Sequence, residues 1–134
     1  MNLLPLLNED LALEYSAAIQ YIQHAAMLFG PYFAFSKELL EHADDEMRHA
    51  RLLNNHITYL SGIPAVIMGP VFTASENEGM LKQDLAGEET AIERYTARIG
   101  QARAQGDEAT AALLQNILTD EVSHKTDLES ILGV

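Results

Sequence analysis

The protein has 134 residues, and its 20 Asp and Glu residues against 8 Lys and Arg residues give a formal net charge of −12. This length predicts one domain, spanning residues 1–134, and a hydrophobic fraction of 48% excludes intrinsic disorder. The absence of cysteine excludes disulfides, thiolate metal sites and a catalytic thiol. Because the chain is strongly acidic, we expect no nucleic-acid partner.

No segment predicts a membrane span or a targeting peptide. The apolar stretch 63–72 is too short to cross a bilayer, and it contains Pro64, Gly69 and Pro70. The first residues lack the positive charge of a signal peptide. We therefore expect a cytoplasmic protein without a membrane partner.

The first half of the sequence predicts two helices. Apolar residues recur at helical spacing within residues 6–29, at Leu7, Leu11, Tyr15, Ala18 and Ile22. Gly30 and Pro31 end this helix, and a second helix is predicted over residues 33–61.

The second half predicts two more helices, over residues 75–105 and 107–132. Ser75 and Glu78 have the spacing of a capping box at the start of the third helix. Gly106 is typical of a helix stop, and Asp107 is predicted to be the N-cap of the fourth helix. The sequence therefore predicts an all-α fold without strands.

The lengths of the connections predict the topology. Two connections are tight and favour antiparallel hairpins. The middle one, residues 62–74, can reach about 43 Å when extended, whereas a helix of about 28 residues is about 42 Å long. It can place the second and third helices parallel, which is the ferritin-like four-helix bundle with one long crossover. Because this crossover is apolar, we expect it to pack on the bundle or on a neighbouring subunit.

The two halves of the sequence repeat one another. Glu14 and Tyr21 in the first helix match Glu88 and Tyr95 in the third at one constant offset along the chain. The second and fourth helices match at nearly the same offset, and their matched residues are Asp45, Glu46, His49 and Asp120, Glu121, His124. A pseudo-two-fold bundle would bring the matched residues together about its axis.

The repeated residues have the chemistry of metal ligands. A spacing of three places Glu46 and His49 on one helix face, as it does for Glu121 and His124. One Glu-x-x-His is commonly a solvated face, but two copies, each paired with a further glutamate, favour a site for two metal ions. Oxygen and nitrogen donors without sulfur favour iron or manganese, in a pattern already known for di-iron and di-manganese bundles. The predicted ligands are Glu14, Glu46, His49, Glu88, Glu121 and His124.

Three strings in the sequence resemble bacterioferritin, and the resemblance covers nearly the whole chain. They are LEYSAAIQYIQHA at 13–25, DEMRHA at 45–50 and DEVSH at 120–124. The resemblance implies a ferroxidase centre made of the six predicted ligands, with Tyr21 beside it. It also implies that two iron ions bind each subunit, that dioxygen or hydrogen peroxide oxidises Fe(II), and that Fe(III) is stored.

Met47 follows Glu46, so it points about 100° away from the metal face, towards the outside of the bundle. The resemblance implies that Met47 from each of two subunits ligates one haem b at a dimer interface. Alternatively, Met47 is an apolar contact in a dimer without haem. Bacterioferritins usually carry a fifth helix, whereas this sequence ends at Val134. We therefore expect a homo-oligomer that is a dimer or a small closed shell of about twelve subunits.

Other interpretations remain open. A rubrerythrin-like peroxidase or a manganese catalase would use similar ligands, but rubrerythrins commonly add a cysteine-ligated iron domain. Glu89 and Glu93 do not fall three residues after Glu88, as such enzymes require. A non-catalytic structural bundle would need cations to neutralise the glutamates, and no Lys or Arg repeats at matched positions. His42 and His56 are interpreted as outer or packing residues.

Overall fold

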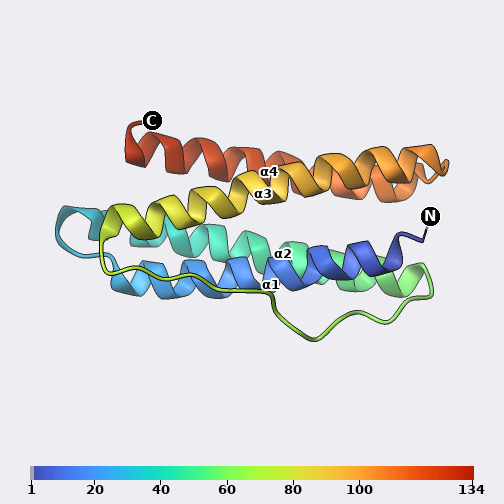
Figure 1. The fold of residues 1–134 in the computed structure, drawn as a ribbon, viewed down its shortest axis with the longest axis horizontal. Coiled ribbons are helices and arrows are strands. Elements are labelled where there is room, and N and C mark those ends of the chain that lie inside the picture. The colour runs from blue at the N-terminus through green and yellow to red at the C-terminus, as the bar shows by residue number, and fades with distance from the viewer. Residues whose placement is uncertain (1) are drawn as a thin grey trace.

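Four long helices form two antiparallel pairs in the computed structural model, which describes residues 2–134 (Figure 1). The helices are α1 (Leu4–Met27), α2 (Ser36–Tyr59), α3 (Asn77–Ala104) and α4 (Glu108–Leu132), and a short 3-10 helix, η1 (Gly30–Phe35), precedes α2. The chain between α2 and α3 returns along the length of the bundle, so these two helices run parallel (Figure 1). The predicted four-helix bundle with one long crossover is confirmed.

The helix ends agree only in part with the sequence-based prediction. The side chain of Asp107 accepts a hydrogen bond from the Thr110 backbone N–H at 3.0 Å, as expected for the N-cap of α4. The capping box predicted at Ser75 is wrong, because α3 starts two residues later and its N-cap, Glu76, makes no side-chain cap bond. The carboxylate of Glu78 instead accepts a hydrogen bond from the Tyr32 hydroxyl at 3.4 Å.

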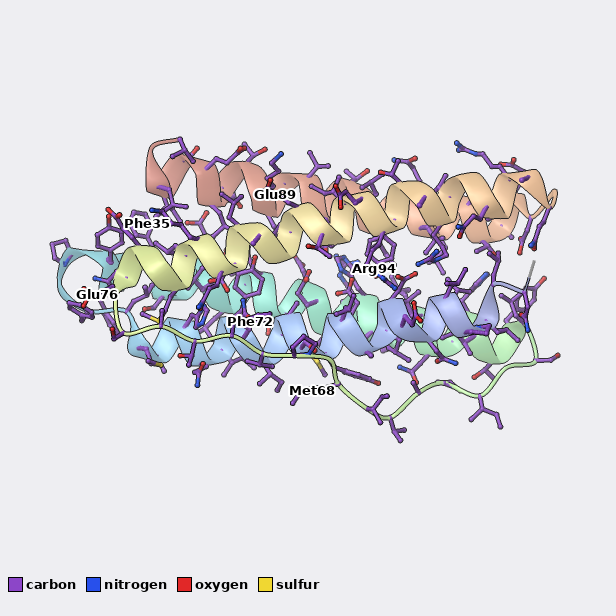
Figure 2. All side chains as sticks on the ribbon, viewed as in Figure 1. Phe35, Met68, Phe72, Glu76, Glu89 and Arg94 are labelled. Carbon is purple, nitrogen blue, oxygen red and sulfur yellow. The ribbon has the colours of Figure 1, made fainter. Side chains whose placement is uncertain are left out.

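The crossover, residues 60–76, is attached to α1 mainly through its backbone. The Ala65 N–H donates to Asn8 Oδ1 at 2.7 Å, and the Gly69 N–H donates to the Ala12 carbonyl at 3.2 Å. A Cβ atom at Gly69 would lie 3.0 Å from Leu13 Cδ2, so glycine allows this close approach. The apolar side chains of the crossover nevertheless remain exposed: Ile63, Val66, Ile67, Met68 and Phe72 (Figure 2). The predicted packing on the bundle therefore holds for the backbone and leaves an apolar surface.

The hydrophobic core is divided into two clusters. One includes Leu11, Leu53 and Ile117, and the other includes Leu39 and Leu128. Along each helix, the buried glutamates and histidines of the sequence repeat lie between these clusters. Within residues 2–134, no helix is both long enough and apolar enough to cross a membrane.

Candidate metal centre

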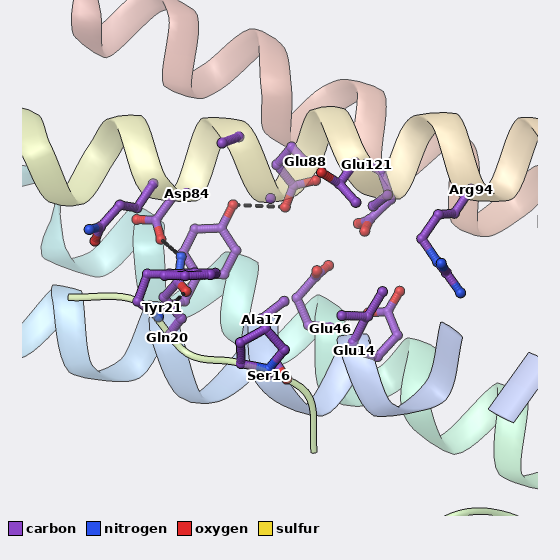
Figure 3. A pocket seen from close by; sticks show the side chains of 18 of the residues that line it. Glu14, Ser16, Ala17, Gln20, Tyr21, Glu46, Asp84, Glu88, Arg94 and Glu121 are labelled. Atoms are coloured by element: carbon purple, nitrogen blue, oxygen red, sulfur yellow. Dashed lines mark hydrogen bonds between the residues drawn. The ribbon is translucent and has the colours of Figure 1, made fainter. Parts of the chain in front are cut away.

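The six repeated glutamates and histidines converge at the middle of the bundle, between the two apolar clusters. α1 and α3 each contribute one glutamate, and α2 and α4 each contribute a Glu-x-x-His pair. Each of the six is at most 3% exposed. Figure 3 shows the carboxylates pointing towards one another: Glu14, Glu46, Glu88 and Glu121.

The six residues form two overlapping groups of possible ligands. The first consists of Glu14, Glu46, His49 and Glu121, and in each group all ligand atoms lie within 4.8 Å of one another. His49 Nδ1 is 3.4 Å from both Glu14 Oε2 and Glu46 Oε1, and 3.6 Å from Glu121 Oε1.

The second group consists of Glu46, Glu88, Glu121 and His124. His124 Nδ1 is 3.3 Å from both Glu46 Oε1 and Glu121 Oε1, and 3.5 Å from Glu88 Oε1. The two groups share Glu46 and Glu121, so these carboxylates are placed to bridge two ions. Glu14 and His49 are placed to complete the ligand set of one ion, and Glu88 and His124 that of the other.

Every member of the centre has at least one buried polar atom without a hydrogen-bond partner. These atoms include Nδ1 of both histidines and both carboxylate oxygens of Glu121. Among residues 2–134, no Lys or Arg side chain forms an ion pair with any of the four glutamates. Burying unpaired charges costs free energy, and two divalent cations would bind all of these oxygen and nitrogen atoms at once. The arrangement therefore fits a two-metal site better than a structural bundle held by ion pairs.

The outer nitrogen of each histidine is held by an aspartate from the other half of the repeat. His49 Nε2 lies 2.8 Å from Asp120 Oδ2, and His124 Nε2 lies 2.8 Å from Asp45 Oδ2. Arg48 donates a hydrogen bond to Asp120 at 2.6 Å. These contacts fix both rings with Nδ1 facing the carboxylates, so Nδ1 is the nitrogen available to a metal ion.

Two tyrosines orient glutamates of the centre, and each tyrosine bonds a glutamate from the other half of the repeat. The Tyr21 hydroxyl donates to Glu88 Oε1 at 2.8 Å (Figure 3). The Tyr95 hydroxyl donates to Glu14 Oε1 at 2.6 Å. Burial raises the pKa of both tyrosines well above the ordinary value, and the neighbouring carboxylates raise it further. Both phenols therefore stay protonated and act as hydrogen-bond donors.

The crowding of carboxylates in a buried site changes their proton affinity. Burial raises the pKa of Glu46, Glu88 and Glu121, and repulsion from neighbouring glutamates adds to it. Burial alone would lower the pKa of His49, but the nearby carboxylates of Glu14, Glu121 and Asp120 together outweigh it and raise that pKa to about 9. The metal-free centre therefore retains protons at neutral pH, and metal ions would displace them.

The centre opens into a cavity of about 420 Å³ between α1 and α3. Its walls include the small side chains of Ala17 and Ala91 together with Gly87, and the crossover contributes Phe72. A Cβ atom added at Gly87 would meet no atom within 4 Å. This cavity gives small molecules a route to the carboxylates from the α1 and α3 side.

The structure places the remaining histidines outside this centre. His24 bonds Asp84 and the Phe72 carbonyl, and so ties the crossover to α1 and α3. His56 contacts the Thr110 hydroxyl at 2.7 Å, in agreement with a packing role. His42 is only 3% exposed, and its ring stacks on that of His124 at a centroid distance of 4.1 Å.

One group was missed by the sequence analysis. Glu38, His42 and Asp127 bring three ligand atoms within 4.8 Å of one another. The spacing of Glu38 and His42 on α2 was the only signal in the sequence, because Asp127 comes from α4 and has no counterpart in the repeat.

Met47 lies on the outer face of α2, as predicted, with 47% of its surface exposed. It lines a shallow apolar hollow of about 340 Å³ together with Tyr15, Ile19 and residues 66–68 of the crossover.

A protein-family model described as a ferritin-like domain matches residues 4–134. Bacterioferritin from Mycolicibacterium paratuberculosis is 34% identical, over 98% of this chain and 84% of that protein. Among solved structures, a ferritin-like diiron-carboxylate protein from Bacillus anthracis matches with a TM-score of 0.93 and 34% identity, covering 97% of this chain and 94% of that one.

A dodecameric thioferritin described as a bacterioferritin-related protein of Bacteroides fragilis matches with a TM-score of 0.90 and 28% identity, covering 98% of this chain and 84% of that one. The resemblance inferred from the three sequence strings is thus supported along the whole bundle. On these matches and its fold, the chain belongs to the bacterioferritins within the ferritin-like family.

Proposed function

We propose that the protein stores iron and acts as a ferroxidase that oxidises Fe(II) at the six-residue centre. The observation that carries this proposal is the pair of ligand groups that share Glu46 and Glu121. Membership of the bacterioferritins supports it. Manganese fits the same oxygen and nitrogen donors, so the donor set alone does not select iron.

In this proposal each residue has a distinct task. Glu14 and His49 bind one Fe(II), Glu88 and His124 bind the other, and the two shared glutamates bridge them. Tyr21 is held beside the centre by its bond to Glu88 Oε1. The two ions supply two electrons, which reduce hydrogen peroxide and two protons to two water molecules, or dioxygen and two protons to hydrogen peroxide. The buried carboxylates and imidazoles release the protons as iron binds.

The oxidation is tested by adding Fe(II) in air to the metal-free protein and following Fe(III) formation. Glu46→Ala removes one shared carboxylate and is expected to abolish the fast phase, while Glu89→Ala, at an exposed position beside Glu88, serves as the matched control. Oxidation by Glu46→Ala as fast as by the unchanged protein would show that the centre is elsewhere. Rapid peroxide turnover without retained iron would instead favour the rubrerythrin-like or manganese catalase alternative.

We also propose that the protein forms a homo-oligomer. The outer face of α1 and α2 exposes Ile19, Ile22 and Met47, and the crossover adds Val66 and Ile67 beside it. An apolar surface of this extent is typical of an interface. The dodecameric Bacteroides fragilis relative supports a small closed shell, and light scattering after size-exclusion chromatography distinguishes a shell from a dimer.

Haem b is a further proposed ligand of this oligomer. The Met47 thioether is half exposed on the apolar hollow, where a second subunit could present its own Met47. If haem does not bind, Met47 remains an apolar contact of the interface.

A further inference from the structure

A third group of possible metal ligands lies one helical turn from the centre, and it shares no residue with the two groups described above. It consists of Glu38 and His42 on α2 and Asp127 on α4. α2 begins and α4 ends at the same end of the bundle, so these three residues meet there (Figure 1). We propose that Glu38, His42 and Asp127 bind a third divalent metal ion.

The group places a buried imidazole against two carboxylates, a set of nitrogen and oxygen donors that can hold a divalent ion. His42 Nε2 lies 3.1 Å from Asp127 Oδ2, and this imidazole is buried while both carboxylates are partly exposed. Within residues 2–134, no Lys or Arg side chain forms an ion pair with Glu38 or Asp127. Partial burial and the adjacent Asp127 raise the pKa of Glu38. Two adjacent carboxylates and a fixed imidazole thus lack the cation that would balance them.

The internal repeat shows that the fold itself does not require these polar residues. At the offset that relates Glu46 to Glu121, Glu38 of α2 matches Leu113 of α4, and His42 matches Ile117. The same offset, subtracted from a position in α4, matches Asp127 with Leu52 of α2. Ile117 is fully buried in the apolar cluster at the opposite end of the bundle. At the three matched positions, one half of the repeat thus has apolar side chains where the other has an imidazole and two carboxylates. Packing alone gives no reason for this difference.

The position of the group indicates its use. The His42 ring stacks on the ring of His124, a predicted ligand of the centre. Glu38 and Asp127 face solvent from α2 and α4, whereas the cavity is lined mainly from α1 and α3. An ion held by three side chains keeps positions open for water and exchanges readily. The third site would hold iron between solvent and the centre, and this role, unlike the binding itself, rests on the proposed function.

The experiment measures cobalt(II) bound per subunit at equilibrium without oxygen, and locates it by anomalous diffraction from cobalt-soaked crystals. Asp127→Asn and Glu38→Gln are each expected to lose one equivalent and the peak at this group, while the two peaks at the centre remain. His42→Ile introduces the residue found at the matched position, Ile117, and is expected to lose the same equivalent. Glu41→Gln, an exposed neighbour on α2, is the control and should lose none.

The two proposals can fail separately. A double variant, Glu46→Ala with Glu121→Ala, is expected to lose the centre yet retain the third ion. Equal cobalt uptake by Asp127→Asn and the unchanged protein, or no anomalous peak between Glu38 and Asp127, would overturn the third site whether or not iron is oxidised. If the unchanged protein shows the third cobalt peak but does not oxidise Fe(II), only the proposed ferroxidase function is contradicted, and the third site stands.

Discussion

His49 and Asp120, which belong to opposite halves of the repeat, are joined by a contact of 2.8 Å between Nε2 and Oδ2. His124 and Asp45 make the same contact in the reverse direction. Each half of the chain thus orients the histidine of the other half, and both Nδ1 atoms face the shared carboxylates. The centre depends on the pairing of α2 with α4 as much as on the ligands themselves.

Weakening one of these supports should lower metal affinity without removing a ligand. Asp120→Asn keeps the size of the side chain but removes its charge, and we expect manganese(II) or cobalt(II) affinity to fall by about 10–100-fold. Titration calorimetry measures this change. Asp44→Asn, an exposed aspartate on α2, is the matched control and should bind as the unchanged protein does. Equal affinity of Asp120→Asn would mean that the contact does not position His49.

The stability of the metal-free protein should fall as the pH rises. The pKa of His49 is raised to about 9 in the folded state, and the pKa of Glu46 and Glu121 is raised well above 4.5. A group with a raised folded-state pKa stabilises the fold below its unfolded-state pKa, and this stabilisation is lost as the pH rises through the folded-state value. For His49 the loss runs from its ordinary 6.5 to about 9, and for the glutamates it begins above 4.5.

Thermal unfolding followed by circular dichroism tests this trend between about pH 5 and about pH 9. With manganese(II) bound, the decline should be smaller, because the metal ions replace the protons of the centre. A metal-free melting temperature that rises over this range would contradict the assigned pKa directions.

Filling the cavity should slow iron oxidation without touching a ligand. Gly87 lines the cavity, and a side chain added there meets open space, so Gly87→Leu should obstruct the route to the carboxylates. Replacing a helical glycine should also stabilise α3 by about 0.5–1 kcal/mol. Gly100→Leu, also in α3 with open space around it, gives the same stabilisation away from the cavity. A several-fold slower oxidation in Gly87→Leu alone is expected, and equal rates in both variants would mean that reactants enter elsewhere.

Haem binding should depend on the sulfur of Met47. Leucine is similarly apolar but cannot ligate iron, so Met47→Leu should preserve the interface and lose the Soret absorption of haem added to the protein. Met27→Leu, at an exposed position on α1, is the control. Haem absorption that is unchanged in Met47→Leu, or absent from the unchanged protein, would leave Met47 as an interface contact only.

The internal repeat explains why so much of the centre could be predicted. The nearly constant offset between the two halves selected the same glutamates and histidines that the bundle brings together, because helical spacing fixes which residues share a face. The long crossover was predictable from the reach of its chain. The matched tyrosines could also be located, but only the structure shows that each of them bonds a glutamate of the opposite half.

Other features depend on contacts that sequence spacing does not encode. At the start of α3, the carboxylate of Glu78 accepts a hydrogen bond from the Tyr32 hydroxyl and does not cap the helix. The burial of His42 follows from its stacking on His124, which is distant in the sequence and lies on another helix. The crossover was expected to pack on the bundle or on a neighbouring subunit, and within one subunit its hydrogen bonds to Asn8 and Ala12 hold the backbone while several of its apolar side chains remain exposed.

The central claim is that two metal ions bind in the middle of the bundle and share Glu46 and Glu121. Anomalous diffraction at the iron edge, from crystals loaded with Fe(II) without oxygen, tests it most directly. The account predicts one peak among Glu14, His49 and the two shared glutamates, and a second among Glu88, His124 and the same pair. A single peak, or iron found only at exposed carboxylates, would contradict it.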